Sequence, residues 1–99
     1  MTSGASDETD ERKRGFRVTG RVQGVGFRWW TQKSATSLGL RGTVRNCADG
    51  SVEVHAAGST DSVESLEQLL HDGPSSARVE GVEEIDPRGS LPDGFRIVR

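Results

Sequence analysis

Hydrophobic and polar residues alternate in several short segments, which is the pattern of half-buried β-strands. The first such segment covers residues 15–22, and two more cover residues 41–46 and 50–58. Asp49 and Gly50 lie at the junction of the last two, and an Asp-Gly pair between alternating segments is a strong hairpin signal. The pattern therefore predicts one strand, followed later by two antiparallel strands.

Two other segments have the spacing of amphipathic helices. Residues 27–38 contain no Gly or Pro, and Gly39 ends a row of small and apolar residues at helical spacing: Phe27, Thr31, Ala35 and Leu38. Residues 58–74 begin with Ser, Thr and Asp candidates for an N-cap and close with Gly73 and Pro74. One face of this second helix is expected to carry Val63, Leu66, Leu69 and Leu70.

The chain ends with two further alternating segments, at residues 77–86 and 95–99, of which the last is short. The predicted order is β-α-β-β-α-β, with too few helices to cover both faces of a sheet. We therefore expect an α+β fold, a ferredoxin-like α/β sandwich with two helices packed on one face of an antiparallel sheet. Residues 15–99 would form this domain. Residues 1–14 are polar without apolar periodicity and are predicted to be a disordered tail.

Composition limits the class of protein. A chain of 99 residues suffices for one domain with a modest core. It contains no apolar run of about 18 residues, and its N-terminus lacks the apolar region of a secretory signal. We expect a soluble, cytoplasmic monomer that binds no membrane and no cofactor. Cys47 is the only cysteine, which leaves no intramolecular disulfide and no Cys-rich metal site.

Charge is unevenly distributed, although the formal net charge is only −2. Residues 12–48 carry nine Lys or Arg and no Asp or Glu, whereas residues 49–99 carry eleven acidic residues and four basic ones. If the first half forms one face of the domain, that face attracts anions.

The segment QGVGFR joins the first predicted strand to the first helix. Gly24 and Gly26 allow positive φ angles and a close approach of the backbone to a ligand. A glycine loop at a helix N-terminus directs several N–H groups into one concavity, which suits phosphate. Arg28 would add two parallel donors. We expect an anion site whose backbone donors come from Gln23, Gly24, Val25, Gly26, Phe27 and Arg28. No Lys-Ser/Thr pair follows the glycines, so this is not a Walker motif.

Over residues 15–99 the chain resembles the acylphosphatases, small enzymes that hydrolyse the carboxyl–phosphate bond of acyl phosphates. The resemblance rests on two motifs, VQGVGFR at residues 22–28 and GTVRN at residues 42–46. It implies that the first motif is a phosphate loop with a catalytic arginine at Arg28. It also implies a catalytic asparagine at Asn46 and the ferredoxin-like sandwich already expected.

Three features depart from the family pattern. Thr43 stands where many members have Trp, which changes the wall beside the site. The polar tail is longer than usual, and residues 86–95 match only loosely. None of these departures affects the two catalytic positions.

The chain offers no Ser-His-Asp set, no paired carboxylates near the loop and no metal cluster. A carboxylate leaving group has a conjugate acid of pKa about 4 and departs without being protonated. Catalysis then requires only that the phosphoryl group is held and one water is aimed at phosphorus. The Asn46 amide is uncharged and can orient that water, whose proton would pass to a phosphate oxygen of the substrate. Without the resemblance, Asn46 would be better explained as a turn residue beside Asp-Gly.

The remaining polar and aromatic residues are given structural interpretations. His55 and His71 are expected to be ordinary surface or half-buried residues, and Cys47 a small residue at a turn. Gln23 is expected to shape the loop through its backbone N–H, and Arg21 to be a solvated strand residue. Trp29 and Trp30 are expected to pack or to lie on the helix surface, with stacking on an aryl group as the alternative.

Three other functions remain open. RNA-recognition domains share this element order, but they place aromatics on central strands, and none is found in residues 42–46, 51–55 or 77–82. A regulatory domain that binds a phosphometabolite without turnover would use Arg28 but not Asn46. Acylphosphatase-like domains also begin larger carbamoyl-phosphate-handling proteins, but a stand-alone enzyme is preferred because no zinc-finger cysteines occur here. Nucleic acid is not an expected partner.

Overall fold

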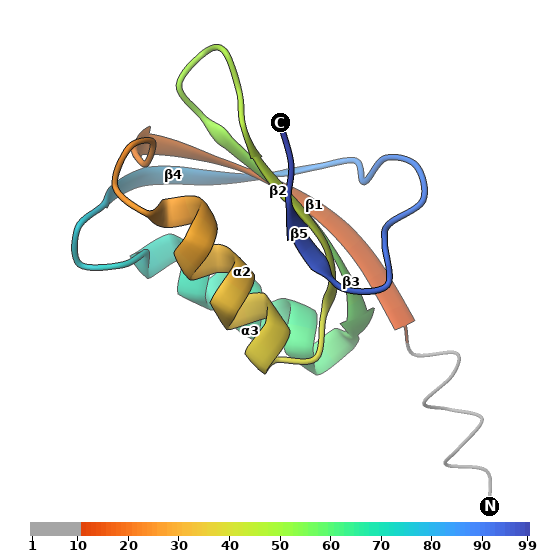
Figure 1. Cartoon of the computed structure of the whole chain (residues 1–99). Coiled ribbons are helices and arrows are strands. Elements are labelled where there is room, and N and C mark those ends of the chain that lie inside the picture. The colour runs from red at the N-terminus through yellow and green to blue at the C-terminus, as the bar shows by residue number, and fades with distance from the viewer. Residues whose placement is uncertain (1–10) are drawn as a thin grey trace, which may run out of the picture.

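Five strands form one sheet, and two helices pack against one of its faces (Figure 1). The computed structural model describes residues 11–99, and the part of the predicted tail at residues 1–10 lies outside the described residues. The elements are β1 (Glu11–Arg21), α2 (Phe27–Ser37), β2 (Arg41–Asn46), β3 (Val52–Ser59), α3 (Thr60–Asp72), β4 (Arg78–Ile85) and β5 (Phe95–Ile97). The predicted ferredoxin-like α+β sandwich is confirmed.

The sheet is mixed, which corrects the expectation of an antiparallel sheet. Its strand order is β4-β1-β3-β2-β5. The first four strands pair antiparallel, but β5 runs parallel to β2, with Phe95 opposite Gly42 and Ile97 opposite Val44. The reason is topological: β4 and β5 occupy opposite edges, so the segment between them must cross the sheet. Backbone hydrogen bonds from Gly42 N to Gly94 O (3.0 Å) and from Val98 N to Val44 O (2.9 Å) hold the β5 segment against β2.

Strand β1 begins at Glu11, so the predicted tail boundary at residue 14 is wrong. Residues 11–14 pair with β3, from Glu11 opposite Ser59 to Arg14 opposite Ala56. The Arg14 side chain also bonds Glu84 on β4 at 2.8 Å and Glu67 on α3 at 3.0 Å. Residues 11–14 bury no apolar side chain, so backbone pairing and ion pairs hold this part of the strand in the sheet. Apolar alternation therefore could not reveal it.

The core lies between the sheet and the helices. Every second residue of the central strands points into it, and α2 contributes Phe27 and Ala35 while α3 contributes Val63, Leu66 and Leu70. The strand residues of this layer, all fully buried, are Phe16, Val18, Val44, Val52 and Val54. Leu69 was predicted to face the core but is 37% exposed. Adjacent helical positions differ by about 100°, and packing selects the row that contains Leu70.

The C-terminus of α2 and the N-terminus of α3 lie where the sequence predicts them. Gly39 follows α2, where Gly39 N donates to Thr36 O (3.0 Å) and Leu40 N to Ala35 O (2.9 Å). Ser59 is the N-cap of α3, and its Oγ accepts from Ser62 N at 3.1 Å. The C-terminal end of α2 leads directly into β2, which carries Asn46.

Candidate functional site

A cavity of about 170 Å³ lies at the N-terminal end of α2. This volume suits a small group better than a drug-sized ligand, which occupies roughly 300 Å³ or more. Its lining residues come from four segments: Val22, Gly24, Gly26, Phe27, Arg28, Trp29, Asn46 and Ile97. The structure thus brings together Arg28, Asn46 and three of the predicted loop residues, whereas Gln23 and Val25 do not line the cavity.

The loop before α2 leaves its backbone donors free. None of the N–H groups from Gln23 to Arg28 donates a hydrogen bond to another of the described residues. Gly24 (φ 75°) and Gly26 (φ 78°) have left-handed backbone conformations, and a Cβ at either would meet no atom within 4 Å. Free donors at the positive end of a helix form a site in which an anion is stabilised.

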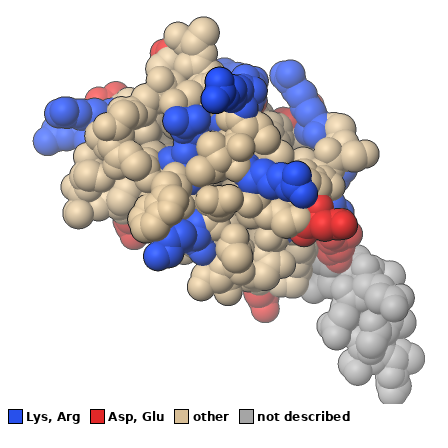
Figure 2. All heavy atoms as spheres, in the orientation of Figure 1, with Lys and Arg blue, Asp and Glu red and all other residues tan. Residues whose placement is uncertain are grey.

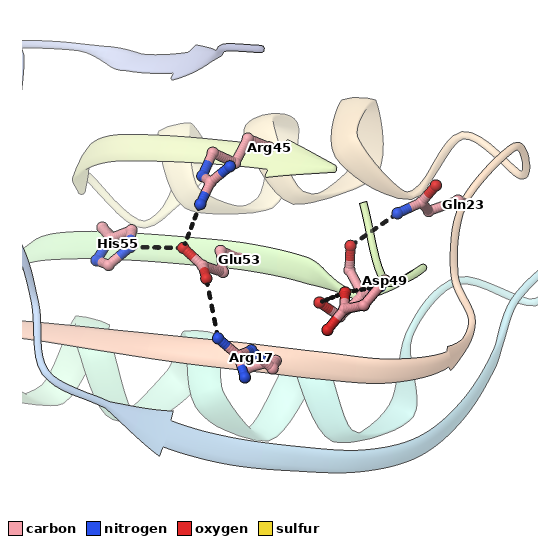
Figure 3. Close-up of polar contacts among 7 residues, drawn as sticks. Arg17, Gln23, Arg45, Asp49, Glu53 and His55 are labelled. Carbon is pink, nitrogen blue, oxygen red and sulfur yellow. Dashed lines mark hydrogen bonds and ion pairs between the residues drawn. The ribbon is translucent and has the colours of Figure 1, made fainter. Parts of the chain in front are cut away.

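Two contacts fix this loop. Ser76 Oγ donates to Val25 O at 2.8 Å, which joins the loop to the segment after α3. Gln23 Nε2 donates to Cys47 O and to Ser51 O, both at 2.8 Å. Gln23 therefore joins the loop to the β2–β3 turn through its side-chain amide (Figure 3), which corrects the expectation that only its backbone shapes the loop. No short-range pattern signals this bond, because its two ends lie far apart in the sequence.

Arg28 lies in the first turn of α2 and is half-buried. It makes no hydrogen bond or ion pair with the other residues of the described chain, 11–99. Four of the nine cations in residues 12–48 differ from Arg28, because they pair with carboxylates: Arg14, Arg17, Arg41 and Arg45. Folding thus neutralises part of the expected charge asymmetry, and Arg28 keeps its donors for a ligand. Figure 2 shows Lys and Arg side chains at several places on one face, with acidic side chains mainly at its margin.

Asn46 is the last residue of β2. Side chains alternate along a strand, so Asn46 lies on the same, helix-covered face as Val44, which is fully buried. Its Oδ1 atom is buried and accepts no hydrogen bond from the described residues. A buried acceptor without a partner is unusual in a protein and is found at sites where a ligand or a water completes the bonding.

The turn after Asn46 is tightly bonded. Cys47 N donates to Ser51 O at 2.8 Å, and Asp49 Oδ1 accepts from Ser51 Oγ (2.6 Å) and Ser51 N (2.9 Å). These bonds from the Ser51 hydroxyl and N–H lower the pKa of Asp49. Cys47 is a turn residue, as predicted, and the predicted hairpin is confirmed.

The sheet face away from the helices carries an ion-pair cluster (Figure 3). The strand register places Arg17 and Arg45 on either side of Glu53, whose carboxylate they bond at 3.2 and 3.1 Å. His55 Nε2 lies 3.5 Å from the same carboxylate. Burial pushes the pKa of Glu53 up, but the bonds from Arg17 and His55 and the Arg45 charge outweigh burial and lower it. His55 is only 7% exposed, so it is more buried than the surface or half-buried position expected of it.

The described residues form neither a metal-ion cluster nor a membrane-spanning helix. Among residues 11–99, no three His, Cys, Asp or Glu side chains are grouped so as to hold a metal ion. No helix in the same part of the chain is long and apolar enough to span a membrane.

The fold and the cavity define a class of protein: a small α/β sandwich whose first strand-to-helix loop presents free backbone donors beside an unpaired arginine. The acylphosphatase family pattern matches residues 14–97. An acylphosphatase from Salinibacter ruber is 48% identical over 94 residues, which cover 93% of this chain and 99% of that protein. This chain belongs to the acylphosphatase family.

Solved structures agree with the sequence relatives. The structure of an acylphosphatase from Coxiella burnetii superposes with a TM-score of 0.85 at 36% identity, over 93% of this chain and 97% of that one. For the acylphosphatase from Bacillus subtilis the TM-score is 0.81 at 33% identity, over 88% of this chain and 98% of that one.

Proposed function

We propose that this protein hydrolyses the carboxyl–phosphate bond of acyl phosphates, giving a carboxylate and inorganic phosphate. One observation supports this above the others: a single cavity contains free loop donors, an unpaired Arg28 and the Asn46 amide with an unpartnered buried oxygen. The acylphosphatases among its relatives support the same reaction.

The phosphoryl group would be held by the loop and Arg28. The N–H groups of residues 23–28 and the α2 N-terminus supply fixed partial positive charge, and the Arg28 guanidinium supplies a full one. These donors stay in place during reaction, so they stabilise the charge on the equatorial oxygens of the transition state without reorganisation.

Asn46 would position the attacking water. Its Oδ1 can accept a hydrogen bond from that water, and its Nδ2 can donate to a phosphoryl oxygen. An amide does not ionise in this pH range, so it cannot act as a general base. The water proton is transferred to a phosphoryl oxygen of the substrate as the oxygen–phosphorus bond forms and the carboxylate leaves with its electron pair.

The carboxylate needs no acid to leave, because its conjugate acid has a pKa of about 4. The loop and Arg28 also supply the charge stabilisation that a metal ion supplies in many phosphoryl-transfer enzymes. We therefore propose turnover without metal or cofactor. We also propose that the active unit is a monomer in the cytoplasm.

The test is release of phosphate and benzoate from benzoyl phosphate in the presence of EDTA. Arg28→Ala should raise KM and lower kcat, with a loss in kcat/KM of about 10³-fold or more. Asn46→Ala should lower kcat by about 100-fold with a smaller change in KM. Arg21→Ala is the matched control, because Arg21 is an exposed arginine at the end of β1 that does not line the cavity. It should retain most activity.

Three results would contradict the proposal. Activity that EDTA abolishes would contradict metal independence. A kcat unchanged in Asn46→Ala would remove the water-positioning role. A wild-type protein that binds inorganic phosphate through Arg28 but does not hydrolyse benzoyl phosphate would be a phosphate-binding domain without turnover.

A further inference from the structure

Two exposed apolar side chains lie at the candidate site. Among the described residues, three large apolar side chains are exposed: Trp29 (59%), Ile97 (39%) and Leu69 (37%). Trp29 and Ile97 both line the cavity that contains Arg28 and Asn46, whereas Leu69 lies on α3 and does not. Two of the three exposed large apolar side chains of the described residues therefore lie at the site.

The fold directs Trp29 toward β5. Trp29 and Gln32 are three residues apart on α2 and share one helix face. That face points at β5, because Gln32 Nε2 donates to Phe95 O at 3.0 Å. Ile97 lies two residues after Phe95 and is opposite Val44, on the side of the sheet that carries Asn46. The indole and the isoleucine thus belong to neighbouring elements that border one cavity.

Trp29 is oriented by a surface contact and not by the core. Lys33 Nζ lies 4.6 Å from the centroid of the indole ring, a cation–π arrangement. The next residue, Trp30, differs because it is partly buried against the core and its ring lies 5.4 Å from that of Phe27. Helix propensity favours Ala or Lys over Trp at an exposed position. Neither packing nor helix formation accounts for an exposed indole at position 29.

We propose that Trp29 and Ile97 form the binding wall for the acyl group of the substrate. This inference rests on the proposed function. The loop and Arg28 bind only the phosphoryl group, which all acyl phosphates share, so discrimination must come from contacts with the remainder of the molecule. An apolar wall beside Arg28 favours acyl phosphates with an aromatic or large apolar acyl group over those with a small one, because burial and ring contacts stabilise the larger group.

The experiment compares kcat/KM for benzoyl phosphate and acetyl phosphate. The two differ in intrinsic reactivity, so the informative quantity is the change in their ratio between wild type and variant. Trp29→Ala should lower the benzoyl-to-acetyl ratio about 3- to 10-fold, and Ile97→Ala about 2-fold. Trp29→Phe keeps an aromatic ring and should restore most of the preference. Leu69→Ala, an equally exposed apolar residue outside the cavity, should leave the ratio unchanged.

The outcomes separate this inference from the proposed function. If wild type hydrolyses both substrates and the ratio is unchanged from wild type in Trp29→Ala and in Ile97→Ala, the acyl wall is refuted and the activity stands. An equal loss on both substrates also refutes it, because such a loss reflects the phosphoryl site or the fold. If wild type hydrolyses neither substrate, the proposed function fails. Circular dichroism of each variant identifies unfolding, and Ile97→Ala tests the wall independently if Trp29→Ala is unfolded.

Discussion

The bond between Gln23 and the β2–β3 turn should control both stability and catalysis. Gln23 is the first residue of the phosphate loop, and its Nε2 donates to Cys47 O and Ser51 O at 2.8 Å each. These carbonyls belong to the turn that begins directly after Asn46. The informative change is Gln23→Met, which keeps an unbranched side chain of similar length and removes both donors.

The loss of stability can be worked from these two bonds. Each contributes about 0.5 to 1.5 kcal/mol, and neither carbonyl is left unpaired, because Gly50 N still donates to Cys47 O and Cys47 N still donates to Ser51 O. We expect a decrease in the free energy of unfolding of about 1.5 kcal/mol. For a domain of this size the corresponding decrease in Tm is about 6 to 12 °C.

The effect on catalysis should be larger than this free energy suggests. The bond sets the distance between the loop, which is proposed to hold the phosphoryl group, and Asn46, which is proposed to place the water. A displacement of about 1 Å between reacting groups can cost about 100-fold in rate. We expect kcat to fall about 10- to 100-fold, with a smaller change in KM, because the N–H groups of the loop and Arg28 are still present.

The assay combines thermal unfolding with steady-state hydrolysis of benzoyl phosphate. Gln68→Met is the matched control, because Gln68 is exposed on α3 and outside the cavity. The double variant with Asn46→Ala tests the mechanism: if Gln23 acts by placing Asn46, its effect on kcat should shrink when Asn46 is absent. Additive effects, or a Gln23→Met variant with the Tm and kcat of wild type, would refute the positioning role.

Two further predictions concern stability. Glu53→Gln should decrease the free energy of unfolding by about 2 kcal/mol at neutral pH, because Arg17 and Arg45 lose their charged partner but remain partly solvated. The pKa of Glu53 is lowered by folding, so its contribution is present above the ordinary Glu pKa of 4.5 and is lost as pH falls below it. The Tm difference between wild type and Glu53→Gln should therefore shrink in thermal unfolding below pH 4.5 and be constant above it. The control Glu64→Gln, at an exposed position on α3, should show little difference throughout. A Glu53→Gln difference independent of pH would contradict this. Gly26→Ala should fold with a loss of about 1 to 2 kcal/mol, since φ is 78° but its Cβ meets no atom within 4 Å. Gly42→Ala should fail to fold, since its Cβ would overlap the His55 carbonyl, and equal Tm values for the two Gly variants would refute this reasoning.

The local sequence was sufficient for most elements. Both helices, the hairpin at Asp49-Gly50 and the order of the elements along the chain were predictable, because they depend on periodicity and on turn residues close in the chain. The start of β1 was not predictable, since residues 11–14 have no apolar alternation and are held by pairing with β3. The direction of β5 was also missed, because a strand of three residues carries no signal for which neighbour it joins.

The charged residues also show a difference between what the sequence predicts and what the fold decides. The excess of Lys and Arg in residues 12–48 is visible in the sequence, but the sequence does not show which cations are neutralised. Strand register decides which cations are neutralised in the sheet, because it places Arg17 and Arg45 beside Glu53. Arg28 lies on α2 and has no carboxylate partner among the described residues. The charge of a side chain can be read from the sequence. Whether that side chain is free to bind a ligand depends on which other side chains lie beside it in the folded protein.

The sequence by itself determined the loop, the helix that follows it and the candidate residue Arg28, because glycine placement and helix signals act over a few residues. Asn46 became a candidate only through the resemblance to the family. Only the tertiary structure decided that Gln23 bonds the turn after Asn46 and that Trp29 and Ile97 border the same cavity. These contacts join segments far apart in the chain, and they depend on the order and register of the five strands. That arrangement arises from packing the whole core and cannot be read from any one segment.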